Sequence, residues 1–174
     1  MPTRYSRTLA TLHWLLALMI IGALFGGKVL LANTPNSDPG KLFSLSLHLS
    51  LGLAILALMT LRVIVRWRSA TPPHADIGNE ILNKAGIWAH WVLYALVFIM
   101  AVSGIVTARG ADLPDIVFGG SGAPLPDIFT GSARTLHGIT STALIVLIIG
   151  HIGAAIYHQY VRKDGLLARM SLRR

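Results

Sequence analysis

Residues 136–157 read LHGITSTALIVLIIGHIGAAIY, an apolar run with a histidine near each end and no Asp, Glu, Lys or Arg. Crossing the hydrocarbon core of a bilayer takes about 20 predominantly apolar residues in a helix. A backbone in lipid has no water to bond with, so such a run satisfies its amides only by becoming helical. The stretch therefore predicts a transmembrane helix that carries two histidines, His137 and His151.

Three further runs share this length and character, at residues 9–31, 42–64 and 87–108. The composition agrees, because 53% of the residues are hydrophobic and only 13% are charged, about half the charged fraction of a soluble domain. We predict an all-α integral membrane protein, a four-helix bundle that forms one membrane domain over residues 1–174. The sequence leaves the structure of the link 109–133 open.

Lysine and arginine are concentrated on one side of the predicted bundle. With four spans, the N-terminus, the link between the second and third spans and the C-terminus share one side. That side, helix ends included, carries eleven Lys or Arg against three Asp or Glu, and the other side carries four of each. Cytoplasmic loops are enriched in Lys and Arg. We therefore predict cytoplasmic termini and a multi-pass protein of the bacterial inner membrane.

Charge and cysteine content exclude several classes of protein. The net charge of +8 comes from basic residues that flank apolar runs and do not cover one soluble face. We therefore expect the lipid bilayer as a partner and no nucleic acid. The chain has no cysteine, which excludes disulfides, iron–sulfur clusters and haem held by a thiolate or a CxxCH attachment.

The two histidines of the last predicted helix share one face at two depths. They are 14 residues apart in the sequence, which at about 100° per residue is a net rotation of only about −40°. The rise between them is about 21 Å at about 1.5 Å per residue. This spacing suits two stacked cofactors and does not suit a single metal ion, whose ligands lie within a few ångströms of one another.

The direction of each helix predicts which histidines meet. The last helix runs from outside to inside, so His137 is the outer and His151 the inner histidine. The first helix starts inside, which makes His13 inner, and the second starts outside, which makes His48 outer. We predict the pairs His13/His151 and His48/His137, each supplying both axial ligands of one haem iron, for two b-type haems in all.

Other intramembrane residues are candidates for contact with these haems. Gly52 would let a flat macrocycle approach the backbone, although small residues also favour ordinary close helix packing. The same holds for three glycines of the last helix: Gly138, Gly150 and Gly153. Arg62 lies 14 residues after His48 on the same face, where it could neutralise propionates of the inner haem. Its alternative role is a positively charged anchor on the cytoplasmic side.

Two further histidines lie near the inner ends of the predicted helices. His158 follows His151 by seven residues, on nearly the same face, and His90 is in the third helix. Each is a candidate propionate partner, or a proton donor to a quinone beside the inner haem. Each could equally be an interfacial histidine with no such role.

With these residues in order, the chain resembles the bacterial cytochrome b561 family, which is related to the cytochrome b subunits of hydrogenases and formate dehydrogenases. The resemblance covers nearly the whole chain, and the family's four haem ligands match His13, His48, His137 and His151. One departure is Ala101, where the family often has proline, so we expect a less kinked third helix. The other matching elements are Tyr5-Ser6-Arg7, Trp14, Leu61-Arg62, Thr71-Pro72-Pro73, His90, Tyr94, His158, Lys163-Asp164-Gly165-Leu166 and Arg169-Met170.

The small stand-alone members of that family imply an activity. Some of them oxidise superoxide and pass the electrons to ubiquinone, so the resemblance implies an oxidoreductase with ubiquinone as substrate and a small periplasmic electron donor. Lys41 and Arg134 lie near the predicted outer ligands. We treat both as candidate contacts for an anionic donor.

Three alternatives remain open on the sequence alone. A membrane-anchor subunit of a dehydrogenase or hydrogenase is disfavoured by the short outer links, which offer little docking surface. A transporter with a histidine-lined path is disfavoured because every Asp and Glu lies outside the predicted spans, whereas proton and cation pathways usually need buried carboxylates. A structural subunit without a cofactor would leave four intramembrane histidines unexplained.

Overall fold

Four long helices make up most of the computed structural model, which describes residues 2–126 and 131–172. All four are long and apolar enough to cross a membrane, and no strand occurs among the described residues, so the predicted all-α membrane fold is confirmed. The elements, in chain order, are α1 (Arg7–Phe25), the π-helical turn η1 (Gly26–Leu31), α2 (Lys41–Arg68), α3 (Glu80–Gly110), α4 (Leu113–Val117), α5 (Ser132–Tyr157), the π-helical turn η2 (His158–Arg162) and the 3-10 turn η3 (Leu167–Met170).

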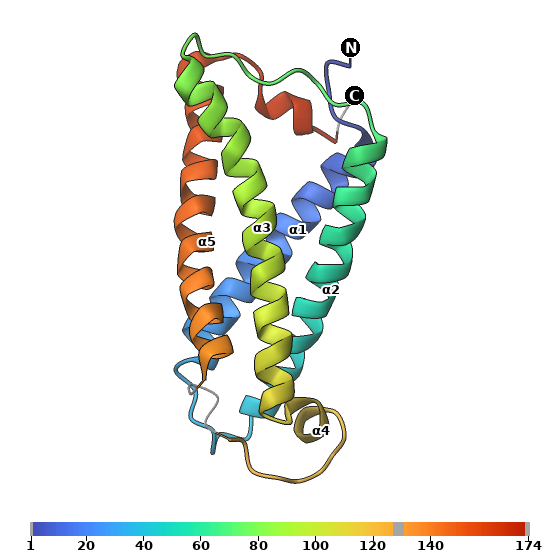
Figure 1. Cartoon of the computed structure of the whole chain (residues 1–174), viewed down its shortest axis with the longest axis vertical. Helices are drawn as coiled ribbons and strands as arrows, with labels where there is room; N and C mark the ends of the chain where they lie inside the picture. The colour runs from blue at the N-terminus through green and yellow to red at the C-terminus, as the bar shows by residue number, and fades with distance from the viewer. Residues whose placement is uncertain (1, 127–130, 173–174) are drawn as a thin grey trace.

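The helices form a bundle in which α3 packs against α5, and α2 packs against both α1 and α3. Figure 1 shows α1 crossing obliquely behind the others, with both chain termini at one end and α4 at the opposite end. We call these the terminal end and the α4 end. Three of the charged residues counted above lie outside the described residues: Asp127, Arg173 and Arg174.

The helices extend beyond the apolar runs that predicted them. The helix α3 begins at Glu80, seven residues before the predicted run, and ends at Gly110. The Asn79 side chain caps it by accepting a hydrogen bond from the Leu82 amide at 3.1 Å. An exposed Glu80–Lys84 ion pair of 2.6 Å supports the first turn. Polar caps lie outside the apolar core, so hydrophobicity alone misses them.

Two apolar clusters hold the bundle together. The larger one lies between the long helices and is made of Leu16, Leu24, Ile55, Met59, Val97 and Leu144. The smaller one, Leu45, Ala108 and Leu113, fixes α4 against α2 and α3. This docking gives the link 109–133 a defined element that the sequence did not reveal.

The terminal end is tied together by residues 163–172, which we call the C-terminal segment. The chain leaves η2 through left-handed backbone at Lys163 (φ 54°) and Gly165 (φ 70°), and turns back across the bundle (Figure 1). The Tyr5 amide donates to the Arg169 carbonyl at 3.0 Å, and the Trp14 indole donates to the Met170 carbonyl at 3.0 Å. The segment therefore joins the two ends of the chain.

Candidate functional site: two histidine pairs inside the bundle

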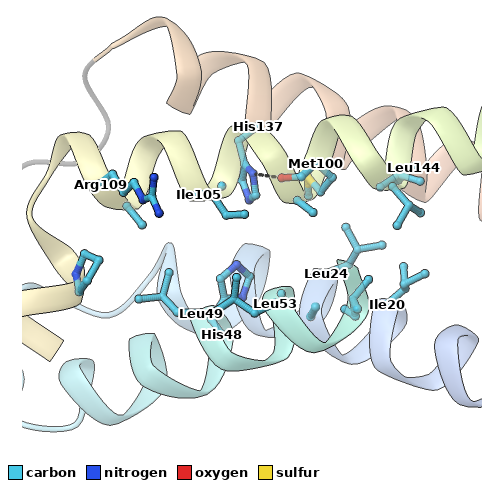
Figure 2. A pocket seen from close by; sticks show the side chains of 18 of the residues that line it. Ile20, Leu24, His48, Leu49, Leu53, Met100, Ile105, Arg109, His137 and Leu144 are labelled. Atoms are coloured by element: carbon cyan, nitrogen blue, oxygen red, sulfur yellow. Dashed lines mark hydrogen bonds between the residues drawn. The ribbon is translucent and has the colours of Figure 1, made fainter. Parts of the chain in front are cut away.

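One pair of facing imidazoles lies toward the α4 end. His48 of α2 and His137 of α5 have ring centres 6.3 Å apart, with their planes at 76°. Figure 2 shows them reaching into one cavity from opposite helices. These are the two residues that we predicted as the outer pair, and the structure brings them together.

A backbone carbonyl fixes the orientation of His137. Its Nδ1 lies 3.0 Å from the Met100 carbonyl oxygen of α3, drawn as a dashed line in Figure 2. A carbonyl can only accept, so Nδ1 carries the proton and Nε2 keeps its lone pair. The Ser103 hydroxyl is 3.2 Å from the same nitrogen. Histidines that bind a metal commonly donate their second ring N–H in this way.

Two glycines make room for these rings. A Cβ on Gly104 of α3 would lie 3.1 Å from His137 Cε1, and a Cβ on Gly27 of η1 would lie 3.1 Å from His48 Cε1. Both distances are tighter than ordinary van der Waals contact. Each helix therefore approaches its histidine through a missing side chain.

A cavity of about 310 Å³ lies between the helices at this pair. Its volume falls at the lower end of the range for ligand pockets, about 300–1,000 Å³. The wall is almost entirely apolar and includes Gly52, whose missing Cβ leaves open space within 4 Å. Figure 2 shows Ile20 and Leu144 at the end toward the bundle centre and Arg109 at the other end.

The second pair lies toward the terminal end. His13 of α1 and His151 of α5 have ring centres 6.2 Å apart, with planes at 74°, which matches our predicted inner pair. His90 of α3 stands against His151, with ring centres 5.3 Å apart, and donates from Nδ1 to the Gly86 carbonyl at 2.6 Å. Among the described residues, no group of three or more His, Cys, Asp or Glu is arranged to hold a metal ion.

Arg62 lies beside this second pair as a buried cation. Its side chain is only 7% exposed, and it donates to the Leu9 carbonyl at 2.7 Å and to the Tyr94 hydroxyl at 3.0 Å. No carboxylate in the described part of the chain pairs with it. Burying a charge without a counter-ion is costly, so the arrangement fits a bound anion.

His158 contacts the C-terminal segment. Its Nδ1 donates to Asp164 Oδ2 at 2.5 Å, and Arg162 lies 3.8 Å from the same oxygen. Partial burial acts to raise the pKa of Asp164, but hydrogen bonds from His158 and the Leu166 amide, together with the Arg162 charge, outweigh it and lower the pKa. The ion pair connects η2 to the C-terminal segment.

The two candidate cations of the α4 end differ in position. Lys41 is 2% exposed, and its ammonium donates to the Leu31 and Thr34 carbonyls, so it caps the end of η1 and is not displayed to an anion outside. Arg134 lies one turn before His137 on α5, half-buried, and its charge acts on both His48 and His137.

The structure thus gathers the predicted residues into two groups. The group at the α4 end consists of His48, His137, Gly52 and Arg134. The group at the terminal end consists of His13, His151, His90 and Arg62. Sequence reasoning missed the residues that support these groups, because spacing along one helix does not show which residues of another element contact it. They are Gly27, Met100, Ser103, Gly104, Arg109 and Asp164.

The fold and the histidines together define an all-helical membrane protein in which imidazoles face one another at two depths. Residues 4–171 match the family model described as prokaryotic cytochrome b561, so the chain belongs to that family. Membership implies a transmembrane electron-transport protein that binds b-type haem.

Curated relatives match along nearly their whole length. Cytochrome b561 homolog 2 of Escherichia coli (strain K12) is 27% identical over 97% of this chain and 92% of its own. A protein of Yersinia pestis named probable superoxide oxidase CybB is 30% identical over 98% of this chain and 97% of its own. Cytochrome b562 of Cereibacter sphaeroides is 29% identical over 95% of this chain and 94% of its own.

The geometry of both pairs fits a bis-histidine haem. Two imidazoles that share one metal ion, at metal–nitrogen distances of about 2 Å, have ring centres about 6 Å apart, and the observed separations are 6.2 and 6.3 Å. His137 presents Nε2 because Nδ1 is engaged by Met100. The buried cation Arg62 suits an anionic edge of such a group.

Proposed function

We propose that this protein is a dihaem b-type cytochrome, an oxidoreductase that passes electrons from a small donor on the periplasmic side to ubiquinone. The observation that carries the proposal is the pair of facing imidazoles at each of two depths. When bound, two haems take up and release single electrons, which lets a one-electron donor serve a two-electron acceptor.

Each residue group has its own part in this proposal. His48 and His137 hold the haem near the α4 end, with Gly52 leaving space for the macrocycle. His13 and His151 hold the haem near the terminal end. Arg62 neutralises a propionate there, because it is buried without a carboxylate partner among the described residues.

The donor that we propose is superoxide, on the strength of the name of the Yersinia pestis relative. Two superoxide ions then become two molecules of dioxygen, and their two electrons reduce one ubiquinone to ubiquinol with two protons. Of the two candidate anion contacts, we favour Arg134, since its charge acts on both histidines of the α4 end, whereas Lys41 is buried and bonded to carbonyls.

The acceptor site that we propose lies at the terminal end, on the cytoplasmic side of the bacterial inner membrane. The Lys/Arg excess on that side supports this orientation. His90 and His158 are the candidate proton donors to the quinone. His90 stands against His151, and His158 is bonded to a carboxylate near the surface, Asp164.

The test is a dithionite-reduced minus oxidised spectrum of the purified protein, with haem counted as the pyridine haemochrome. We expect a b-type band and two haems per chain, and one haem in both His48→Ala and His13→Ala. Superoxide should then reduce the oxidised protein, and ubiquinone should reoxidise it. Protein that carries no haem after purification from a haem-replete host would instead favour the histidine-lined transporter.

A further inference from the structure

A single cation lies at the mouth of the α4-end cavity. Arg109, in the last turn of α3, is the only charged residue among the described residues that line this cavity. Because Arg109 is exposed, we call its end of the cavity the mouth. Figure 2 shows its side chain beyond His137, at the opposite end from Leu144. The cavity therefore combines an apolar interior, two imidazoles and one guanidinium at its mouth.

The Arg109 guanidinium has no counter-ion in the described part of the chain. None of the ion pairs among residues 2–126 and 131–172 involves it. The neighbouring turn is held in place, because Leu113 is 2% exposed and packs with Leu45 and Ala108. This packing positions Pro114 and Phe118 of the α4 region against the same cavity, so protein surrounds part of the mouth where Arg109 lies.

A ligand that matches this cavity is flat and apolar in its body and anionic at one edge. We propose that Arg109 binds a carboxylate of the group held between His48 and His137, which is a propionate of the α4-end haem; this inference rests on the proposed function. Arg134 is not among the residues that line the cavity, so the contact falls to Arg109. Guanidinium–carboxylate pairs are strong, directional and often bidentate.

The contact has a consequence for the reduction potential. A fixed positive charge near the iron favours the reduced state, which carries one positive charge fewer. At roughly 10 Å and an effective dielectric of about 20, removing one unit charge shifts the reduction equilibrium about tenfold, which is about 59 mV for one electron. The haem of the terminal end lies at another depth and should change much less.

The experiment is a spectroelectrochemical titration of the dihaem protein and three variants. The α4-end haem is identified as the one missing from His137→Ala. We expect Arg109→Gln to lower its potential by about 59 mV, or to lose that haem alone, and Arg109→Lys to keep most of the wild-type potential. The control is Lys28→Gln, because Lys28 of η1 bonds Thr142 at 3.1 Å and does not line the cavity.

Two results overturn the inference. One is an Arg109→Gln protein with full haem content and an unchanged α4-end potential. The other is an equal shift in Arg109→Gln and Lys28→Gln, which would indicate a general effect of charge. A wild-type protein without haem would instead refute the proposed function, so the two failures are distinguishable.

Discussion

At the scale of single residues, the histidines of the α4 end depend on two glycines, Gly104 and Gly27, which leave room for the imidazole rings. His137 reaches the Met100 carbonyl because Gly104 has no Cβ to block its ring. In the same way, a Cβ on Gly27 would lie 3.1 Å from the His48 ring. Neither glycine has a positive φ, so their role is space and not conformational freedom.

Replacing Gly104 by alanine should remove the haem of the α4 end. The new Cβ would lie 3.1 Å from His137 Cε1, so the ring would have to shift by a few tenths of an ångström, which disturbs its hydrogen bond to the Met100 carbonyl. We expect the haem content to fall from about two per chain to about one. Alanine is about 1 kcal/mol better than glycine in a helix, so a weaker helix would not explain the loss.

The matched control for this variant is Gly22→Ala. Gly22 is exposed and does not line the cavity, and a Cβ there meets no atom within 4 Å, so this protein should keep both haems while gaining the same helix propensity. Two haems with wild-type potentials in Gly104→Ala would contradict the assigned packing.

Variants of Lys41 and Arg134 should have different effects. Loss of Lys41 should lower the stability of the fold, and loss of Arg134 should slow the reaction with superoxide. Lys41→Met removes hydrogen bonds to the Leu31 and Thr34 carbonyls, and bonds from charged groups contribute about 1.5–3 kcal/mol each. We expect a lower melting temperature but an unchanged rate of superoxide-driven haem reduction.

Arg134→Gln should slow the rate of superoxide-driven haem reduction about two- to fivefold at low salt, with a smaller effect near 0.15 M.

Stopped-flow reduction by superoxide and thermal melting in detergent measure these two effects separately. The reverse pattern, in which Lys41→Met slows reduction and Arg134→Gln does not, would assign the anion contact to Lys41. A similar loss of rate in both variants would indicate that only the net charge of this end matters.

At the scale of elements, the sequence predicted the four spans and the depth of each histidine. Rise and direction along a helix are local quantities, which is why His13 and His151 could be paired without a structure. Contacts between helices are not local. The approach of Gly104 to His137 depends on how α3 packs against α5, and α4 docks through one buried side chain, Leu113, in a link without periodicity.

The C-terminal segment should depend on the ionised Asp164 carboxylate. Its pKa is lowered in the folded protein relative to the ordinary value of 3.8. A group with a lowered folded pKa contributes stability that is complete above the ordinary value and is lost as the pH falls through the folded one. We therefore expect the docked segment to be insensitive to Asp164 protonation from pH 8 to about 5, and to loosen below about pH 4.

Hydrogen exchange of C-terminal peptides would measure this docking. Asp164→Asn should speed exchange of residues 163–172 at neutral pH, because the variant loses the carboxylate that His158 hydrogen-bonds and Arg162 pairs with. The difference from wild type should disappear in acid. Asp38→Asn, at the other end of the molecule, is the control, and a difference that persists unchanged at pH 3 would contradict the assignment.

At the scale of the whole molecule, the two ends of the bundle differ in chemistry. The α4 end combines an apolar cavity with Arg109 at its mouth, which is the one cation among the described residues that line it. The terminal end combines His90, Arg62 and the His158–Asp164 hydrogen bond. An end that supplies protons needs titratable groups, and an end that meets a small donor needs access. This asymmetry is useful only if the bundle has one fixed orientation in the membrane.

The proposed orientation can be tested with single cysteines, since the chain has none of its own. Ala123→Cys lies exposed in the loop at the α4 end, and Ala70→Cys lies exposed in the link at the terminal end. A membrane-impermeant maleimide should label Ala123→Cys in intact spheroplasts and Ala70→Cys only after lysis, because Lys and Arg are concentrated at the terminal end. Haem content is the control for folding. The opposite labelling would invert the bundle, put Arg109 and Arg134 on the cytoplasmic side and rule out a periplasmic donor at the α4 end.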